Sequence, residues 1–117
     1  MIFSQIKIGS LEIANRIVVA PMCQYSAING VMTDWHTQHL MQLGYSGASL
    51  IIVEATAVEE IGRITHNCVG IYNDKCIISI RKNLQLAKSV SPKNSYFGIQ
   101  LAHAGRKAST QRPWEGR

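Results

Sequence analysis

Three short apolar runs alternate with two amphipathic segments along the chain, and this order restricts the fold more than any other feature. The runs cover residues 17–20, 49–54 and 96–101, and each is short and apolar enough to be a strand buried on both faces. The segments 35–45 and 74–90 lie between them and carry apolar side chains three or four positions apart. Strands that alternate with helices at such spacings form a parallel sheet with right-handed crossovers. The sequence therefore predicts an α/β protein.

Residues at the ends of the two amphipathic segments support their interpretation as helices. Thr33 precedes the first segment and Asn73 the second, and both residue types cap helix N-termini. Gly47 follows the first segment and is suited to end a helix in a left-handed conformation. Pro92 follows the second segment and cannot continue a helix. Both helices are thus predicted with defined starts and stops.

The remaining segments are shorter. Residues 6–13 alternate apolar and polar around Gly9 and Ser10, which predicts a β-hairpin, and residues 62–65 and 69–72 are predicted as short extended pieces. With no reversal of strand order, the three strands fit consecutive strands of a (β/α)8 TIM barrel, which needs about 250 residues to close. The 117 residues would supply about three βα units after the hairpin, so we expect residues 1–117 to be the N-terminal portion of one barrel domain.

Composition excludes several classes of protein. The chain is 46% hydrophobic and 16% charged, as globular domains are, and its longest apolar run is interrupted by Glu54. No basic start leads into a long apolar core, so neither secretion nor a membrane span is expected. The three cysteines are odd in number and have no metal-ligand spacing, which predicts no metal site and a reducing, cytoplasmic location.

The net charge of +5 raises the question of a nucleic-acid partner. Nine of the twelve lysines and arginines lie after Asp74, whereas six of the seven acidic residues lie at or before it. No aromatic and basic platform and no recognition-helix pattern accompanies this charge. We therefore expect no nucleic-acid partner.

Three segments with usable chemistry follow or end the predicted strands. The carboxyl ends of parallel strands share one edge of a sheet, so Cys23, Ala55 and Gln100 are expected on the same rim. Cys23 could be a weak hydrogen-bond partner of a redox ring, Ala55 leaves room for a flat ligand, and Gln100 offers the donor and acceptor that an imide edge needs. The alternatives are a cysteine that only fills space and a buried amide bonded to neighbouring backbone.

Other polar and aromatic residues have structural interpretations. Tyr25 fits a packed loop aromatic, and Glu54 is expected to bond to neighbouring backbone or to a basic side chain. The loop with His103, Arg106 and Lys107 suits an anion or is simply solvated. The residues expected to be structural or exposed are His36, His39 and His66, and those expected to fill the core are Cys68 and Cys76.

Four segments together resemble the old yellow enzyme family, and more narrowly its bacterial thermophilic-like class, which keeps a cysteine near the flavin. They are residues 20–26 (Ala-Pro-Met-Cys-Gln-Tyr-Ser), 51–58 (Ile-Ile-Val-Glu-Ala-Thr-Ala-Val), 62–64 (Gly-Arg-Ile) and 98–108 (Gly-Ile-Gln-Leu-Ala-His-Ala-Gly-Arg-Lys-Ala). They occur in consecutive order over nearly the whole chain, which makes the resemblance far more specific than any one motif.

The resemblance implies an FMN-containing TIM barrel that takes hydride from NADPH or NADH and passes it from flavin N5 to the β-carbon of an activated alkene. By position, it implies that Cys23 lies near the N5/O4 edge and tunes the flavin as a catalytic residue. It implies that Tyr25 reaches the substrate and that Gln100 bonds the pyrimidine side of the ring. The residues implied to contact the cofactor are Ala20, Pro21, Met22, Cys23, Ala55 and Gln100.

The family's substrate clamp, proton donor and phosphate-binding loops lie on later strands, so we expect this chain to carry part of the flavin site and to be inactive alone. The end of the sequence, from Trp114 to Arg117, resembles an interruption within the loop after the third strand. A three-stranded sheet leaves two unpaired edges, which predicts a homo-oligomer. The alternative function is a non-catalytic remnant or interaction module that assembles through those edges.

Overall fold

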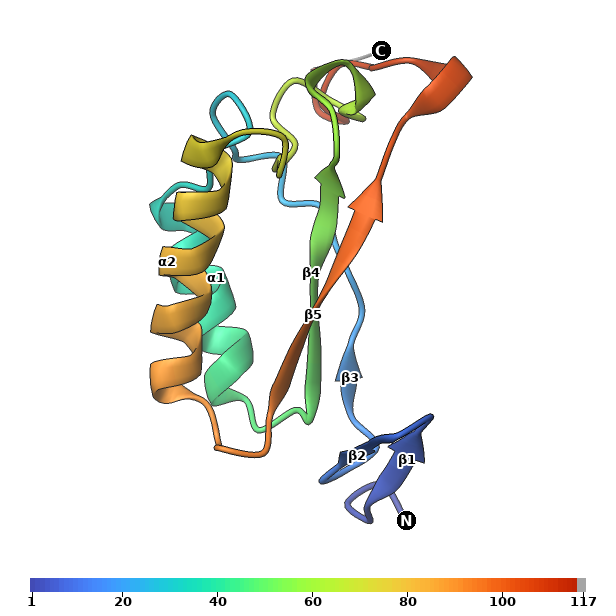
Figure 1. Cartoon of the computed structure of the whole chain (residues 1–117), viewed down its shortest axis with the longest axis vertical. Helices are drawn as coiled ribbons and strands as arrows, with labels where there is room; N and C mark the ends of the chain where they lie inside the picture. Colours follow the sequence, from blue (N-terminus) through green and yellow to red (C-terminus); the bar gives the residue numbers. More distant parts are fainter. Residues whose placement is uncertain (116–117) are drawn as a thin grey trace.

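The computed structural model describes residues 1–115 and contains a three-stranded parallel sheet in the order β3-β4-β5. Both helices lie side by side on one face of this sheet, and a small antiparallel hairpin lies at the end opposite the strand tips (Figure 1). The last two residues of the predicted domain, Gly116 and Arg117, lie outside the described residues. The elements are β1 (Ile6–Ile8), β2 (Leu11–Ile13), β3 (Val18–Val19), α1 (Asp34–Tyr45), β4 (Leu50–Ala57), the 3-10 turn Glu60–Gly62, α2 (Asp74–Val90), β5 (Tyr96–Ala102) and the 3-10 turn Gly105–Lys107.

The helices begin and end where their capping residues predict. At the start of α1, the backbone N–H of Thr33 donates to Nδ1 of His36 at 3.0 Å. At the start of α2, the side chain of Asn73 accepts from the backbone N–H of Cys76 at 3.0 Å. Gly47, just after α1, has a φ of +83°, a conformation in which a glycine is not strained. The predicted hairpin, helices and strand order are confirmed.

The hydrophobic core lies between the helices and the sheet. Because α1 and α2 each bury one apolar stripe, their inward residues meet the apolar residues of β4. The main core cluster consists of Ala27, Met32, Leu40, Val53, Val69, Ile80 and Ala87, with Ile71, Leu84 and Phe97 packed against it. The core thus ties the helices to β4, the central strand.

The strand register defines two faces of the sheet. Val19 and Ile51 are paired, as are Ile51 and Phe97, and Phe97 packs against the core, so this row faces the helices. Gly98 is the next residue of β5, and a Cβ added there would contact Ile52 of β4. Gly98 and Gln100 therefore lie on the opposite face, which no helix covers (Figure 1).

Three expectations about the strands need correction. The strand expected over residues 17–20 is only Val18–Val19, and Val18 is 42% exposed because β3 is an edge strand with one neighbour. The strand expected over residues 49–54 runs on to Ala57, so Glu54 and Ala55 lie within it. The pieces expected over residues 62–65 and 69–72 make only single bridges, from Thr65 to Thr110 and from Gly70 to Ala57.

No helix in residues 1–115 combines the length and the apolar character needed to cross a membrane.

Candidate functional site

A β-bulge interrupts β4 at the point where the candidate site was expected. Val53 pairs with Ile99 and Thr56 pairs with Leu101, so two residues of β4, Glu54 and Ala55, lie opposite the single residue Gln100 of β5. Bulges turn side chains to new directions and are common beside functional sites. The bulge has its own polar support, because the hydroxyl of Thr56 donates to the carbonyl of Glu54 at 2.8 Å.

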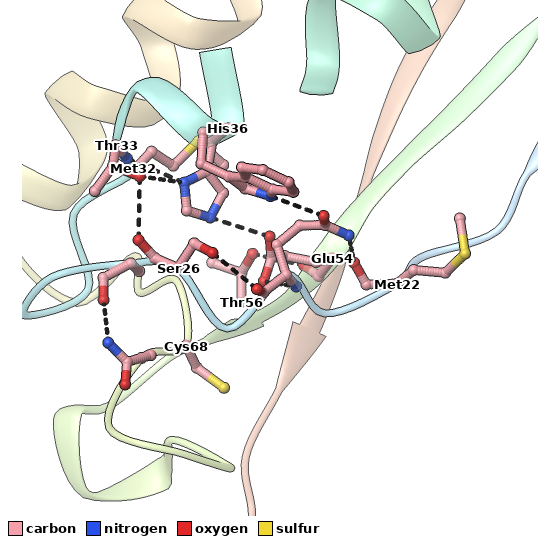
Figure 2. Close-up of polar contacts among 12 residues, drawn as sticks. Met22, Ser26, Met32, Thr33, His36, Glu54, Thr56 and Cys68 are labelled. Atoms are coloured by element: carbon pink, nitrogen blue, oxygen red, sulfur yellow. Dashed lines mark hydrogen bonds and ion pairs between the residues drawn. The ribbon is translucent and has the colours of Figure 1, made fainter. Parts of the chain in front are cut away.

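The Glu54 side chain links the bulge to two other segments (Figure 2). Its Oε2 accepts from the backbone N–H of Gln24 at 3.0 Å, and its Oε1 lies 3.2 Å from Nε2 of His36. Nε2 has no partner at a proper hydrogen-bond angle, so this second interaction is a close electrostatic contact. The expectation that Glu54 bonds to backbone or to a basic side chain is confirmed by the bond from Gln24, and His36, 1% exposed, has a structural role.

The Cys23 thiol lies between two groups that affect it in opposite ways. Its contact with the Cys68 thiol, together with burial, raises the pKa of Cys23, while the nearby backbone of Ala55 favours the thiolate. The same contact lowers the pKa of Cys68, and Thr65 assists by donating its backbone N–H to the Cys68 sulfur at 3.3 Å. Cys23 is therefore the protonated member of this thiol pair.

Tyr25 has an unusual backbone conformation. Its φ of +52° lies in the left-handed region, which costs a non-glycine residue about 1–2 kcal/mol. Its ring packs edge-on against Trp114, with ring centroids 5.6 Å apart, and Arg112 lies over the Trp114 ring at 5.5 Å. Burial is the first cause that raises the pKa of Tyr25, and the thiols and Glu54 add to it, so the phenol stays protonated. Strain held at one residue by its surroundings is typical of functional loops.

The other predicted cofactor residues differ in exposure. Ala20 is exposed, Pro21 is half-buried, Met22 is 52% exposed and Ala55 is buried. The alternative that Gln100 is a buried amide bonded to neighbouring backbone is wrong: its side chain is exposed, because it lies on the face of the sheet that no helix covers. Within residues 1–115, no side-chain or backbone group bonds to its amide.

The remaining polar residues lie around this rim. Nε2 of His103 lies 3.3 Å from Oε2 of Glu59, so this part of the predicted anion loop is occupied by a carboxylate. Arg106 and Lys107 lie in the exposed 3-10 turn after β5. The core roles of Cys68 and Cys76 are confirmed, since both are buried.

Three features of the site were not predicted from the sequence. No residue pattern in the sequence predicts the bulge, because an extra residue in a strand is defined only by the pairing with the neighbouring strand. The contact between Cys23 and Cys68 joins residues far apart in sequence, and the only available signal was that both flank predicted strands. The pairing of His36 with Glu54 was also not predicted, although each residue was assigned a structural role.

Comparisons with known proteins agree with this geometry. The NADH:flavin oxidoreductase / NADH oxidase family matches residues 1–115. An NADH:flavin oxidoreductase of Gibberella zeae is 46% identical over 113 residues, which are 97% of this chain and 27% of that protein. An NADPH dehydrogenase of Listeria monocytogenes is 42% identical over 109 residues, 92% of this chain and 31% of that protein.

Solved structures give the same result. The old yellow enzyme of Pichia sp. AKU4542 matches with a TM-score of 0.76 and 25% identity, over 87% of this chain and 26% of that enzyme. The chain therefore spans less than a third of the length of the relatives named here, and its fold is the N-terminal portion of their (β/α)8 barrel. With these matches, the chain belongs to the NADH:flavin oxidoreductase / NADH oxidase family, the old yellow enzyme family.

Proposed function

We propose that this chain forms the flavin-facing part of an FMN-dependent NAD(P)H oxidoreductase that reduces the C=C bond of activated alkenes such as enones and enals. Family membership supports flavin and nicotinamide chemistry. The observation that carries the proposal is the convergence of three segments at one bulge. Glu54 and Ala55 lie opposite Gln100, and the loop that carries Cys23 is bonded to the bulge through the N–H of Gln24 and the Glu54 carboxylate.

The groups at this rim fit the ring of FMN. A flavin ring is flat and has an imide edge, which needs a donor and an acceptor together. Gln100 offers both on an exposed amide that no described residue engages, and Ala55, opposite it in the bulge, adds little bulk. Bound FMN would supply hydride transfer from NADPH or NADH to the alkene. The residues proposed to hold the ring are Ala20, Pro21, Met22, Cys23, Ala55 and Gln100.

Cys23 would act on the ring through its hydrogen. The raised pKa keeps a proton on its sulfur, so the thiol is a donor at neutral pH. This hydrogen would point to the redox-active edge of the ring when FMN binds. A weak donor at this edge stabilises negative charge on the ring, so Cys23 is proposed as the catalytic residue that tunes the flavin.

Tyr25 is proposed to contact the substrate. The residue is half-buried, its phenol keeps its hydrogen, and the edge-on packing against Trp114 gives the aromatic surface a fixed orientation. Such a wall suits a small apolar alkene with one polar acceptor. Because the three cysteines are free, we also propose a reducing location such as the cytoplasm.

Titration of the purified chain with FMN tests the flavin site. We expect quenching of FMN fluorescence, loss of this quenching in Q100A, and no loss in Q85A, which removes an exposed glutamine from α2. NADPH oxidation with an enone is measured in parallel, and we expect none from the chain alone. Absence of quenching at about 1 mM FMN, the range of weak binding, would count against the proposal.

A second candidate function is an interaction module, which the edge strands support. Strand β5 exposes Leu101 to 62%, β3 exposes Val18 to 42%, and each strand has one unpaired edge. Exposed apolar edges promote pairing with another strand, so we propose association with a second copy. Sedimentation velocity would detect a dimer or larger assembly, and L101K should dissociate it. A monomer at all concentrations would exclude this function.

A further inference from the structure

We propose that Glu54 and His36 are positioning residues that fix the loop of residues 21–26, which carries Cys23 and Tyr25. The inference rests on the proposed function for its meaning, because the loop matters only if it faces a flavin and a substrate. Its evidence is independent of any ligand, since it consists of contacts among the described residues.

Both residues are buried polar groups. His36 and Glu54 are 1% and 5% exposed, and neither belongs to the apolar core cluster. A buried carboxylate is destabilising unless it accepts several interactions, and an apolar side chain of similar size would pack at lower cost. A carboxylate at this position therefore indicates a need for its directional bonds, and those bonds lead to the loop.

The contacts of Glu54 and His36 connect three segments of the chain (Figure 2). The Glu54 carboxylate reaches the backbone N–H of Gln24 with one oxygen and the His36 ring with the other. The opposite ring nitrogen, Nδ1, accepts from the backbone N–H of Thr33, so the hydrogen of a neutral ring lies on Nε2, facing Glu54. The carboxylate thus connects the loop, the bulge of β4 and the N-terminus of α1.

The backbone N–H that Glu54 binds belongs to the residue between the thiol and the left-handed tyrosine. Gln24 lies between Cys23 and Tyr25, so holding its N–H fixes the peptide that follows the thiol and precedes the left-handed residue. The Gln24 side chain completes the anchor: its Nε2 donates to the carbonyl of Met22 at 2.8 Å, and its Oε1 accepts from Nε1 of Trp35 at 2.9 Å. Further along, the hydroxyl of Ser26 donates to the carbonyl of Gln24 at 2.9 Å. The Glu54 bond thus holds the residue that precedes Tyr25.

The test compares E54Q with a control that weakens the fold elsewhere. T37V removes the bond from the Thr37 hydroxyl to Oδ1 of Asn83, 2.6 Å long, which joins α1 to α2 and involves no residue of the loop. All variants carry C68S and C76S, so an aromatic disulfide reagent reports only on Cys23. The second readout is hydrogen exchange of the Gln24 amide by NMR. Neither measurement needs FMN, so failure of flavin binding and failure of this inference are distinguishable.

We expect E54Q to raise both the Cys23 reaction rate and Gln24 exchange by about 10-fold or more, with T37V within about 2-fold of the parent. The reason is that the neutral amide is a weaker acceptor than the carboxylate and that its NH2 group would face the Nε2 hydrogen of His36. If E54Q does not fold, H36N serves, because asparagine keeps an acceptor for Thr33 and removes the nitrogen that faces Glu54. Unchanged rates in the folded variant, or an equal rise in T37V, would overturn the inference.

Discussion

Side-chain amides have different environments on the two sides of the sheet. On the helix side, the amide of Asn83 is buried, accepts from the Thr37 hydroxyl and donates to the carbonyl of Ser79 at 2.8 Å. On the open face, the amide of Gln100 is exposed and engages none of the described residues. An amide satisfied internally stabilises the fold, whereas a free amide beside a bulge is available to a ligand. This difference distinguishes residues that stabilise the fold from residues that are available to a ligand.

The largest expected effect concerns the free energy of unfolding and compares a buried leucine with an exposed one. L40A removes a buried side chain from the core cluster and should lower the free energy of unfolding by about 2–4 kcal/mol. L101A removes the same side chain from the exposed end of β5 and should change it by less than about 0.5 kcal/mol. Urea unfolding measures both. A large effect of L101A would mean that this end of β5 is covered in solution.

A smaller effect is expected for the two amides. N83A breaks two buried hydrogen bonds and should cost about 1–3 kcal/mol. Q100A removes an amide with no described partner and should leave the melting temperature nearly unchanged. Thermal unfolding followed by circular dichroism compares the two variants. If Q100A destabilises the chain as much as N83A, Gln100 has a structural role and the contrast fails.

The smallest effect concerns pH. Since the pKa of Cys68 is lowered, the folded chain loses this proton at a lower pH than the unfolded chain. Stability should therefore rise with pH up to the ordinary thiol range, and this gain is lost as pH falls through the lowered pKa. The raised pKa of Cys23 has the opposite sign, so stability should fall again above that range.

Urea unfolding from about pH 5 to about pH 10, which brackets the ordinary thiol pKa, measures this profile. C68S should remove the rise. C76S is the matched control, because burial raises the pKa of Cys76 and so keeps that thiol protonated on the acid side. A profile that C68S leaves unchanged would contradict the thiol-pair geometry.

The sequence predicted the elements of the fold because their signals are local. Asn73 caps α2, Gly47 follows α1, and the alternation about Gly9 forms the hairpin, each through contacts within a few residues. The extent of β4 and the exposure of Gln100 were not predictable in this way, because they depend on which strands pair and in what register.

The sequence indicated candidate residues for the site but not how these residues are arranged. Placing Cys23, Ala55 and Gln100 on one rim required only parallel strands in sequence order. The opposition of Gln100 to two β4 residues, the left-handed Tyr25 and the contact of Glu54 with His36 arise from long-range packing, which no residue pattern in one chain encodes locally. These unpredicted features are concentrated around the proposed flavin surface.

The most direct test of the central claim is NMR mapping of flavin contact on the intact chain. Amide shifts are recorded during titration with FMN, and the account predicts that they change at residues 20–24, Ala55 and Gln100 and that Q100A weakens them. The same titration with Q85A should match the parent. Shifts spread over α2, or absent from both β4 and β5, would contradict the claim that this rim is the flavin-facing surface.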